Sequence, residues 1–175
     1  IFSDEINYRV ADFIKQTKKV RKIISNNNEV KKIVEKIKSS ESGIIFLGWG
    51  NYDNSFYEEL IKFSQNSNFP IFTDGTSDLR FTSSDHKNII VNHSAILQSL
   101  RLSPDLILQF GNAPTSKIAL EFLNKTKADK FVLNKFGDLK DSSKRKAKVV
   151  NVEPSEFLKI AKLNDLNSTK RKSFI

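Results

Sequence analysis

Short continuous runs of apolar residues alternate with segments of helical apolar spacing along most of this chain. Six runs fit strands, at about residues 44–47, 69–72, 89–91, 106–110, 131–133 and 149–152. An apolar run without alternation is typical of a strand buried on both faces, as in a parallel sheet. Strands that alternate with helices predict an α/β fold. We expect a three-layer sandwich with a parallel sheet of about six strands and helices on both faces.

The two ends of the chain differ in composition from this regular part. Residues 1–40 are rich in Lys, Asn and Ser, and Asn28 can cap a helix that runs from about Glu29 to Lys38. We therefore divide the chain into a linker and helix from an upstream domain (1–40), a central α/β domain (41–163) and a basic linker toward a downstream domain (164–175). The chain has no methionine, even at position 1, so we expect a piece of a longer protein.

Composition excludes several classes of protein. The chain has no cysteine, which rules out disulfides and thiolate metal sites. No apolar run approaches the roughly 20 residues that a membrane span needs, and the first residues do not resemble a signal peptide. We therefore expect a cytoplasmic protein without a membrane span.

The formal net charge of +9 has two interpretations. It fits a solvated, lysine-rich surface, and it also fits a protein that neutralises phosphates of a nucleic acid. The basic runs at 15–22, 144–148 and 170–172 lie far apart, and no aromatic-plus-basic motif accompanies them. We expect no nucleic-acid partner, and a basic nucleic-acid-binding module stays an alternative.

Residues 104–120 predict a strand, a loop and the start of a helix. An apolar run ends at Gly111, the chain turns through residues 112–114, and Thr115, Ser116 and Lys117 begin the helix. In open parallel sheets, ligands bind at the carboxyl ends of the strands. Because a cation in the first helical turn is disfavoured by the helix dipole, Lys117 favours a bound anion or a partner carboxylate here. The alternative is a solvated lysine at a frayed helix end.

The other motifs carry less information. Gly48-Trp49-Gly50 follows a strand, but the third glycine of a dinucleotide fingerprint is replaced by Asp53, whose carboxylate would repel a phosphate. A strand-to-helix turn is therefore the favoured interpretation. His86 and His93 have no metal-ligand spacing, and we expect surface or hydrogen-bonding roles for both.

Two segments carry a family resemblance. Residues 73–80, TDGTSDLR, are similar to a D-x-x-S-x-L-R segment, and residues 89–93 to the short strand and helix start that follow it. Residues 104–117, PDLILQFGNAPTSK, are the strongest match. From about Gly43 to Phe157 the chain resembles the central domain of the 2-succinyl-5-enolpyruvyl-6-hydroxy-3-cyclohexene-1-carboxylate synthase family of menaquinone and phylloquinone biosynthesis.

The resemblance implies a fold like the nucleotide-binding domain of deoxyhypusine synthase. It also implies flanking domains that bind the pyrimidine and diphosphate halves of thiamine diphosphate with Mg²⁺, in a homodimer or homotetramer. The family enzyme decarboxylates 2-oxoglutarate and adds the resulting unit to isochorismate, so it is a transferase. The G-D-G…N-N motif of the diphosphate-binding domain is absent here, since Gly137-Asp138-Leu139 lacks the second glycine. We therefore expect the chain alone to bind no cofactor and to be inactive.

The resemblance also implies substrate-binding residues. Lys117 matches the lysine of the T-S-K block, which in the family faces a pocket for acidic substrates, and Arg80 matches the arginine of the S-x-L-R segment. We expect a substrate-binding set of Lys117, Ser116, Thr115, Asn112 and Arg80, with no catalytic or metal-binding residue in this chain. Some relatives have an arginine directly after the lysine, where this chain has Ile118. A nucleotide- or FAD-binding middle domain of another thiamine-diphosphate enzyme stays an alternative.

Overall fold

All six predicted strands form, and they lie side by side in one parallel sheet. A computed structural model describes residues 27–82, 86–136 and 147–161 of the chain. The strands are β1 (Gly43–Leu47), β2 (Ile71–Thr73), β3 (Ile89–Ile90), β4 (Leu106–Phe110), β5 (Asp129–Asn134) and β6 (Lys148–Asn151). Their order across the sheet is β3-β2-β1-β4-β5-β6. From β1 the next strands, β2 and β3, are added on one side of the sheet, and β4, β5 and β6 are then added on the other side. The direction changes between β1 and β4, so the carboxyl ends of these two strands form the switch point of the sheet.

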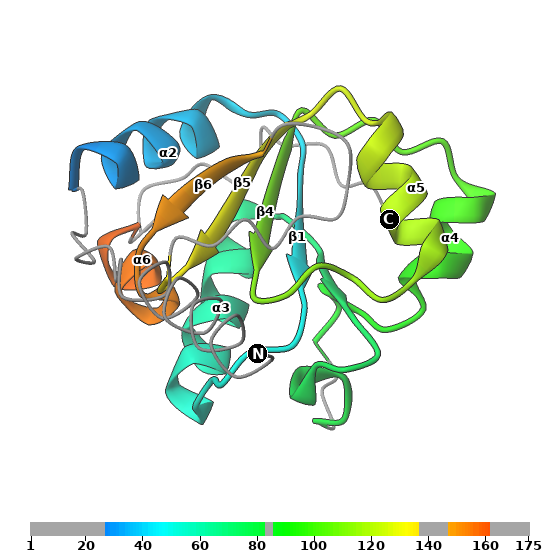
Figure 1. Ribbon diagram of the computed structural model, residues 1–175, viewed down its shortest axis with the longest axis horizontal. Helices are drawn as coiled ribbons and strands as arrows, with labels where there is room; N and C mark the ends of the chain where they lie inside the picture. Colours follow the sequence, from blue (N-terminus) through cyan, green and yellow to red (C-terminus); the bar gives the residue numbers. More distant parts are fainter. Residues whose placement is uncertain (1–26, 83–85, 137–146, 162–175) are drawn as a thin grey trace, which may run out of the picture.

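Helices cover both faces of the sheet, as the alternating pattern predicts. They are α2 (Asn27–Ser39), α3 (Asn54–Ser67), the single 3₁₀ turn η1 (Asp78–Arg80), α4 (His93–Ser99), α5 (Lys117–Lys125) and α6 (Pro154–Ile160). Side chains of α2, α3 and α6 pack on one face, and side chains of α4 and α5 pack on the other. Figure 1 shows these two helical layers on opposite sides of the strands. The predicted three-layer α/β architecture is confirmed.

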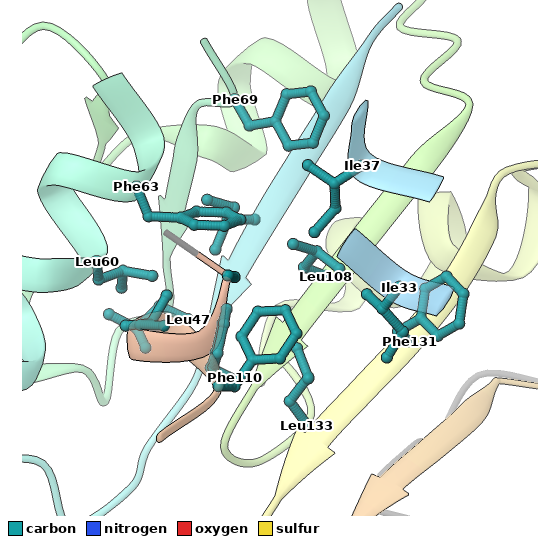
Figure 2. Packing of buried hydrophobic residues seen from close by; sticks show 14 of the residues in the cluster. Ile33, Ile37, Leu47, Leu60, Phe63, Phe69, Leu108, Phe110, Phe131 and Leu133 are labelled. Carbon is teal, nitrogen blue, oxygen red and sulfur yellow. The ribbon is translucent and has the colours of Figure 1, made fainter. Parts of the chain in front are cut away.

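The larger half of the core lies between the sheet and the layer of α2, α3 and α6. In Figure 2, Ile33 and Ile37 of α2 point toward Leu108 and Phe131 of the strands. All four are buried and belong to one apolar cluster. Because burial of one such side chain contributes about 1.5–3 kcal/mol, this helix is held mainly by its apolar stripe. A second cluster, which includes Phe46, underlies α4 and α5.

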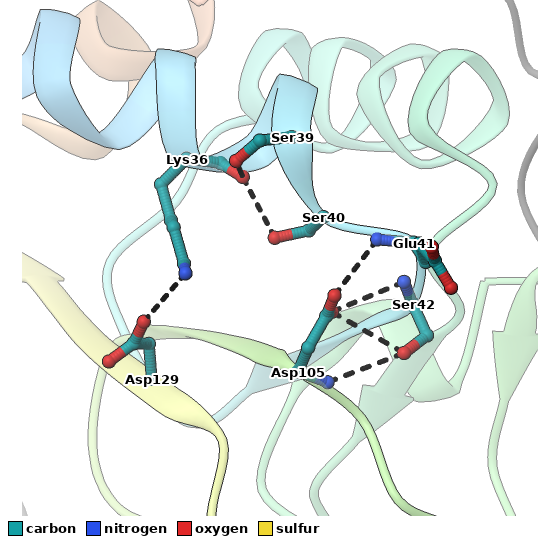
Figure 3. A network of polar contacts seen from close by, with 7 residues as sticks. All are labelled: Lys36, Ser39, Ser40, Glu41, Ser42, Asp105 and Asp129. Carbon is teal, nitrogen blue, oxygen red and sulfur yellow. Dashed lines mark hydrogen bonds and ion pairs between the residues drawn. The ribbon is translucent and has the colours of Figure 1, made fainter.

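A polar network at the amino edge of the sheet joins α2 to the strands. Asp105 accepts hydrogen bonds from the backbone amides of Glu41 (2.9 Å) and Ser42 (3.2 Å), and Lys36 pairs with Asp129 at 2.9 Å. Figure 3 shows this network at the end of α2. The aspartate of the family-like block at 104–117 therefore organises the edge of the sheet opposite to the carboxyl ends of the strands.

Parts of the predicted domain division lie outside the described residues, namely 1–26 and 164–175. The described part of the upstream segment is α2, which packs on the sheet through Val30, Ile33 and Ile37. Domain boundaries at about residues 40 and 163 stay a prediction, as does the likeness to the deoxyhypusine synthase domain.

Candidate functional site

The loops that follow β1 and β4 are locked together at the switch point. The amide of Gly48 donates to the carbonyl of Phe110 (3.0 Å), and the amide of Asn112 donates to the carbonyl of Trp49 (2.9 Å). A Cβ atom at Gly48 would collide with the carbonyl oxygen of Asn112. Gly111 has a positive φ of 73°, which favours glycine. The glycines at these two strand ends therefore allow the backbones of the two loops to lie close together.

The turn after β1 is a strand-to-helix connection, as predicted from the incomplete glycine fingerprint. Asp53 is the N-cap of α3, and its carboxylate accepts a hydrogen bond from the amide of Phe56 at 2.8 Å. The helix N-terminus, where a diphosphate would bind in a dinucleotide fold, is thus occupied by a carboxylate of the chain itself.

Asp74, directly after β2, connects three loops at the carboxyl edge. Its amide donates to the carbonyl of Leu47 (2.9 Å), and its carboxylate accepts from the amide and hydroxyl of Thr115 (both 3.0 Å) and from the hydroxyl of Thr76 (2.8 Å). Burial alone would raise the pKa of this carboxyl, but the hydrogen bonds from Thr76 and Thr115 outweigh burial and hold the pKa below its usual value. Asp74 is therefore a buried anion that fixes the loop before α5.

This arrangement determines what Thr115 and Ser116 do in the described chain. The polar groups of Thr115 are engaged with Asp74. Ser116 is the N-cap of α5, accepts from the amide of Ala119, and shares a hydrogen bond of 2.8 Å with the hydroxyl of Ser94. Both predicted hydroxyls thus build the start of the helix, and substrate contacts for them stay a prediction.

Lys117 is the first residue of α5, at the carboxyl edge of the sheet. Its side chain is exposed, and it makes no hydrogen bond or ion pair with another residue in 27–82, 86–136 or 147–161. A lysine at the positive end of a helix dipole without a counter-charge is open to an incoming anion. Asp74 and Ser116 hold the loop before α5 in place, and they thereby fix the backbone from which the Lys117 side chain extends.

Arg80 lies at the same edge, toward the outer strand β3. Its guanidinium donates to the carbonyl of Val91 at 2.7 Å, and the side chain is half-buried. No contact among the described residues links Arg80 to Lys117. The predicted set is therefore distributed along the edge, with Arg80 near β3, Lys117 at α5 and Asn112 at the switch point.

His93 is buried, so the expected surface role is wrong for this residue. It is 4% exposed, and its ring stacks on Phe72 (5.8 Å between centroids) and meets Phe46 edge-on (6.2 Å). Neither ring nitrogen has a well-formed hydrogen bond within the described residues, although the backbone of Thr73 lies near enough to favour the protonated form. Burial lowers the pKa of His93, and the charge of Asp74 only partly opposes this effect. The signal was present in the sequence, because His93 precedes Ile96 and Leu97 by three and four residues and shares their helical face.

A pocket of about 270 Å³ lies at the carboxyl ends of four strands, and sequence reasoning missed it. We call it the aromatic pocket because two exposed rings line it, Trp49 after β1 and Phe136 after β5. The other lining residues follow the same strand ends: Gly50, Asn51, Tyr52, Gly111, Asn112, Asn134, Lys135, Glu153 and Pro154. The available signal was that every lining segment directly follows a predicted strand.

Two kinds of feature are absent from the described residues. No group of three or more His, Asp or Glu side chains there could hold a metal ion. No helix in that part of the chain is long and apolar enough to cross a membrane.

Several known proteins that are similar to the chain carry the same name. No family model matches the chain. It is 25% identical over 115 residues to a 2-succinyl-5-enolpyruvyl-6-hydroxy-3-cyclohexene-1-carboxylate synthase of Natronomonas pharaonis, covering 65% of this chain and 20% of the relative. It is 24% identical over 160 residues to the synthase of Haloquadratum walsbyi, covering 89% of this chain and 25% of the relative. The chain thus spans about a fifth to a quarter of the length of these relatives, and the resemblance found in the sequence is confirmed.

The chain is also similar to solved structures. One of them is the X-ray structure of a protein isolated from Mycobacterium smegmatis and described as a thiamin diphosphate-dependent enzyme. The match has a TM-score of 0.45 and 13% sequence identity, and it covers 77% of this chain and 28% of that one.

Proposed function

We propose that this chain is the central domain of a thiamine-diphosphate-dependent synthase that decarboxylates 2-oxoglutarate and adds the product to isochorismate. In this proposal the domain is a rigid α/β platform between flanking domains, and its carboxyl edge contributes substrate contacts. The names of the relatives support the reaction, and the share of their length that the chain covers supports a part within a larger enzyme. The menaquinone or phylloquinone pathway, a cytoplasmic location, and a homodimer or homotetramer belong to the same proposal.

The observation that carries the substrate assignment is the position of Lys117. It begins α5 at the ligand-bearing edge of a parallel sheet, and it has no counter-ion among the described residues. Both proposed substrates carry two carboxylates, which a charge-assisted hydrogen bond from an ammonium group would bind and orient. Asp74 and Ser116 hold the loop from which Lys117 extends, so the cation is presented at a fixed place. Arg80 and Asn112 are proposed as weaker contacts along the same edge.

Thiamine diphosphate would supply the electron sink for decarboxylation when bound by the full-length enzyme. The described residues do not fit that group or its Mg²⁺. The G-D-G…N-N motif is absent from the sequence, and the described residues hold no group of three potential metal ligands. We assign the cofactor to the flanking domains and give this chain binding and orienting roles only.

The test is the variant Lys117→Ala in the full-length enzyme that contains this chain. Loss of a charge-assisted hydrogen bond, worth roughly 1.5–3 kcal/mol, should lower kcat/KM for the acidic substrates about ten- to a hundredfold. Lys117→Arg should keep part of the activity. Lys125→Ala is the matched control, because Lys125 lies in the last turn of the same helix and is 80% exposed. Unchanged kinetics in Lys117→Ala would remove this residue from the site.

A further inference from the structure

We propose that the aromatic pocket is a second binding site, which takes a planar, uncharged heteroaromatic ring of about the size of a purine nucleoside. The inference does not depend on the proposed synthase activity. It follows from the two exposed rings that line the pocket, the unpaired polar groups that also line it, and the charges nearby.

The rings give the pocket its preference for a flat ligand. Trp49 is 57% exposed and Phe136 is 60% exposed, although large aromatic side chains are usually covered. Phe136 is held in place, because its amide donates to the side chain of Asn134 at 3.1 Å. Trp49 is held by its carbonyl, which accepts from the amide of Asn112. Two exposed rings on fixed backbones are a surface on which a heterocycle can stack.

Two polar side chains in the lining of the pocket are available to the edge of such a ligand. Tyr52 stacks on Phe56 with ring centroids 4.2 Å apart, which fixes the direction of its hydroxyl. Burial raises the pKa of Tyr52, so the hydroxyl stays protonated and can donate. Neither this hydroxyl nor the side-chain amide of Asn112 has a hydrogen bond with another described residue. Together they offer hydrogen-bond donors and an acceptor, which match the donors and acceptors on the edge of a nucleobase.

Charge and size disfavour a larger, phosphorylated ligand. The ammonium group of Lys135 in the pocket is offset by Glu153 at 3.7 Å, and the carboxylate of Asp53 occupies the start of α3 next to the Tyr52 end of the pocket. The volume of about 270 Å³ is just below the range of roughly 300–1,000 Å³ that is usual for ligand pockets, so a dinucleotide would not be enclosed. A purine nucleoside without a phosphate fits both limits.

The pocket is separate from the proposed substrate cation. Lys117 does not line it, and the lining residues come from the ends of β1, β4, β5 and β6. The two places share the loop between β4 and α5, where Asn112 lines the pocket and is also a proposed weaker substrate contact, while Ser116 caps the helix. Variants of the pocket and of Lys117 can therefore be tested independently.

Trp49 is the only tryptophan of the 175-residue chain, so its fluorescence reports on the pocket directly. The chain is titrated with adenosine up to millimolar concentration while Trp49 is excited at the long-wavelength edge of its absorption. We expect saturable quenching with submillimolar affinity. Phe136→Ala should weaken binding about tenfold or more through lost stacking, and Tyr52→Phe should weaken it several-fold while it keeps the contact with Phe56.

Phe81→Ala is the matched control, because Phe81 is 76% exposed and lies outside the pocket. It should bind adenosine like the unchanged chain, and circular dichroism of each variant verifies the fold. ADP should bind more weakly than adenosine because of the nearby carboxylates. Quenching that does not saturate, equal affinity in Phe136→Ala, or tighter binding of ADP than of adenosine would each overturn the proposal.

Discussion

The carboxylate of Asp74 binds both the backbone amide and the hydroxyl of Thr115, a residue 41 positions later in the chain. This contact spans the central strand β1, because Asp74 follows β2 and Thr115 follows β4. It joins the two sides of the switch point and fixes the loop that leads to Lys117. The geometry of the proposed cation site therefore depends on a residue far from it in sequence.

The first prediction concerns this contact. Asp74→Ala should lower the free energy of unfolding by about 1.5–3 kcal/mol, because hydrogen bonds to a buried charged group are lost and the partners stay buried. Urea denaturation measures the difference. Asp78→Ala, in the same loop but at an exposed position, is the control and should stay within about 0.5 kcal/mol of the unchanged protein. An Asp74→Ala protein as stable as this control would contradict the structural role of the carboxylate.

The second prediction concerns the contact between the loops after β1 and β4. Gly48→Ala should destabilise the fold by about 1–3 kcal/mol, because the added Cβ meets the backbone of Asn112. Gly75→Ala provides a close control, since nothing lies within 4 Å of a Cβ at that position, and it should change stability by less than about 1 kcal/mol. Thermal unfolding of the two variants compares them directly. Similar melting temperatures would show that the loops can separate without cost.

The third prediction concerns pH. Because burial lowers the pKa of His93 in the folded state, the unfolded chain binds a proton at the ordinary value of 6.5 while the folded chain resists it. The contribution of His93 to the free energy of unfolding is fully present above pH 6.5. It is lost as the pH falls below 6.5 toward the pKa of His93 in the folded state. The pKa of the Asp74 carboxyl is lowered from 3.8, so protonation of this group reduces the stability of the fold only in more acidic solution.

Chemical denaturation from about pH 7.5 to about pH 5 tests this dependence. His93→Phe should remove part of the decline, because a phenyl ring can stack on Phe72 without a charge to bury. His86→Gln should leave the decline intact, since His86 is exposed. The same slope in His93→Phe and in the unchanged protein would exclude His93 as its source.

The fold was predictable because the inner strands β1, β2, β4 and β5 are almost entirely buried and therefore appear in the sequence as mainly apolar runs. The edge strands β3 and β6 are only partly buried. Gly43 to Leu47 is the clearest case, with all five residues buried. In β4 the buried run includes the polar Gln109. The ends of the strands were less predictable. The apolar run begins at Phe69, whereas β2 begins two residues later, at Ile71. The local sequence shows that a strand is present, whereas pairing with the neighbouring strands determines the residue at which the strand starts.

The candidate site was only partly predictable. The position of Lys117 at the start of a helix followed from the strand, the loop and the capping serine. The engagement of Thr115 did not, because its partner Asp74 follows a different strand. The aromatic pocket was missed for the same reason, since Trp49 and Phe136 become neighbours of one cavity only when the strands are assembled.

The placement of β1 at the middle of the sheet has a consequence during synthesis on the ribosome. Gly43 pairs with Leu106, so one side of β1 stays without a partner until β4 has emerged. At translation rates of roughly 5–20 residues per second, this takes several seconds. During that interval the apolar strand presents an open hydrogen-bonding edge, and the nascent chain is exposed to aggregation with its neighbours on the same message.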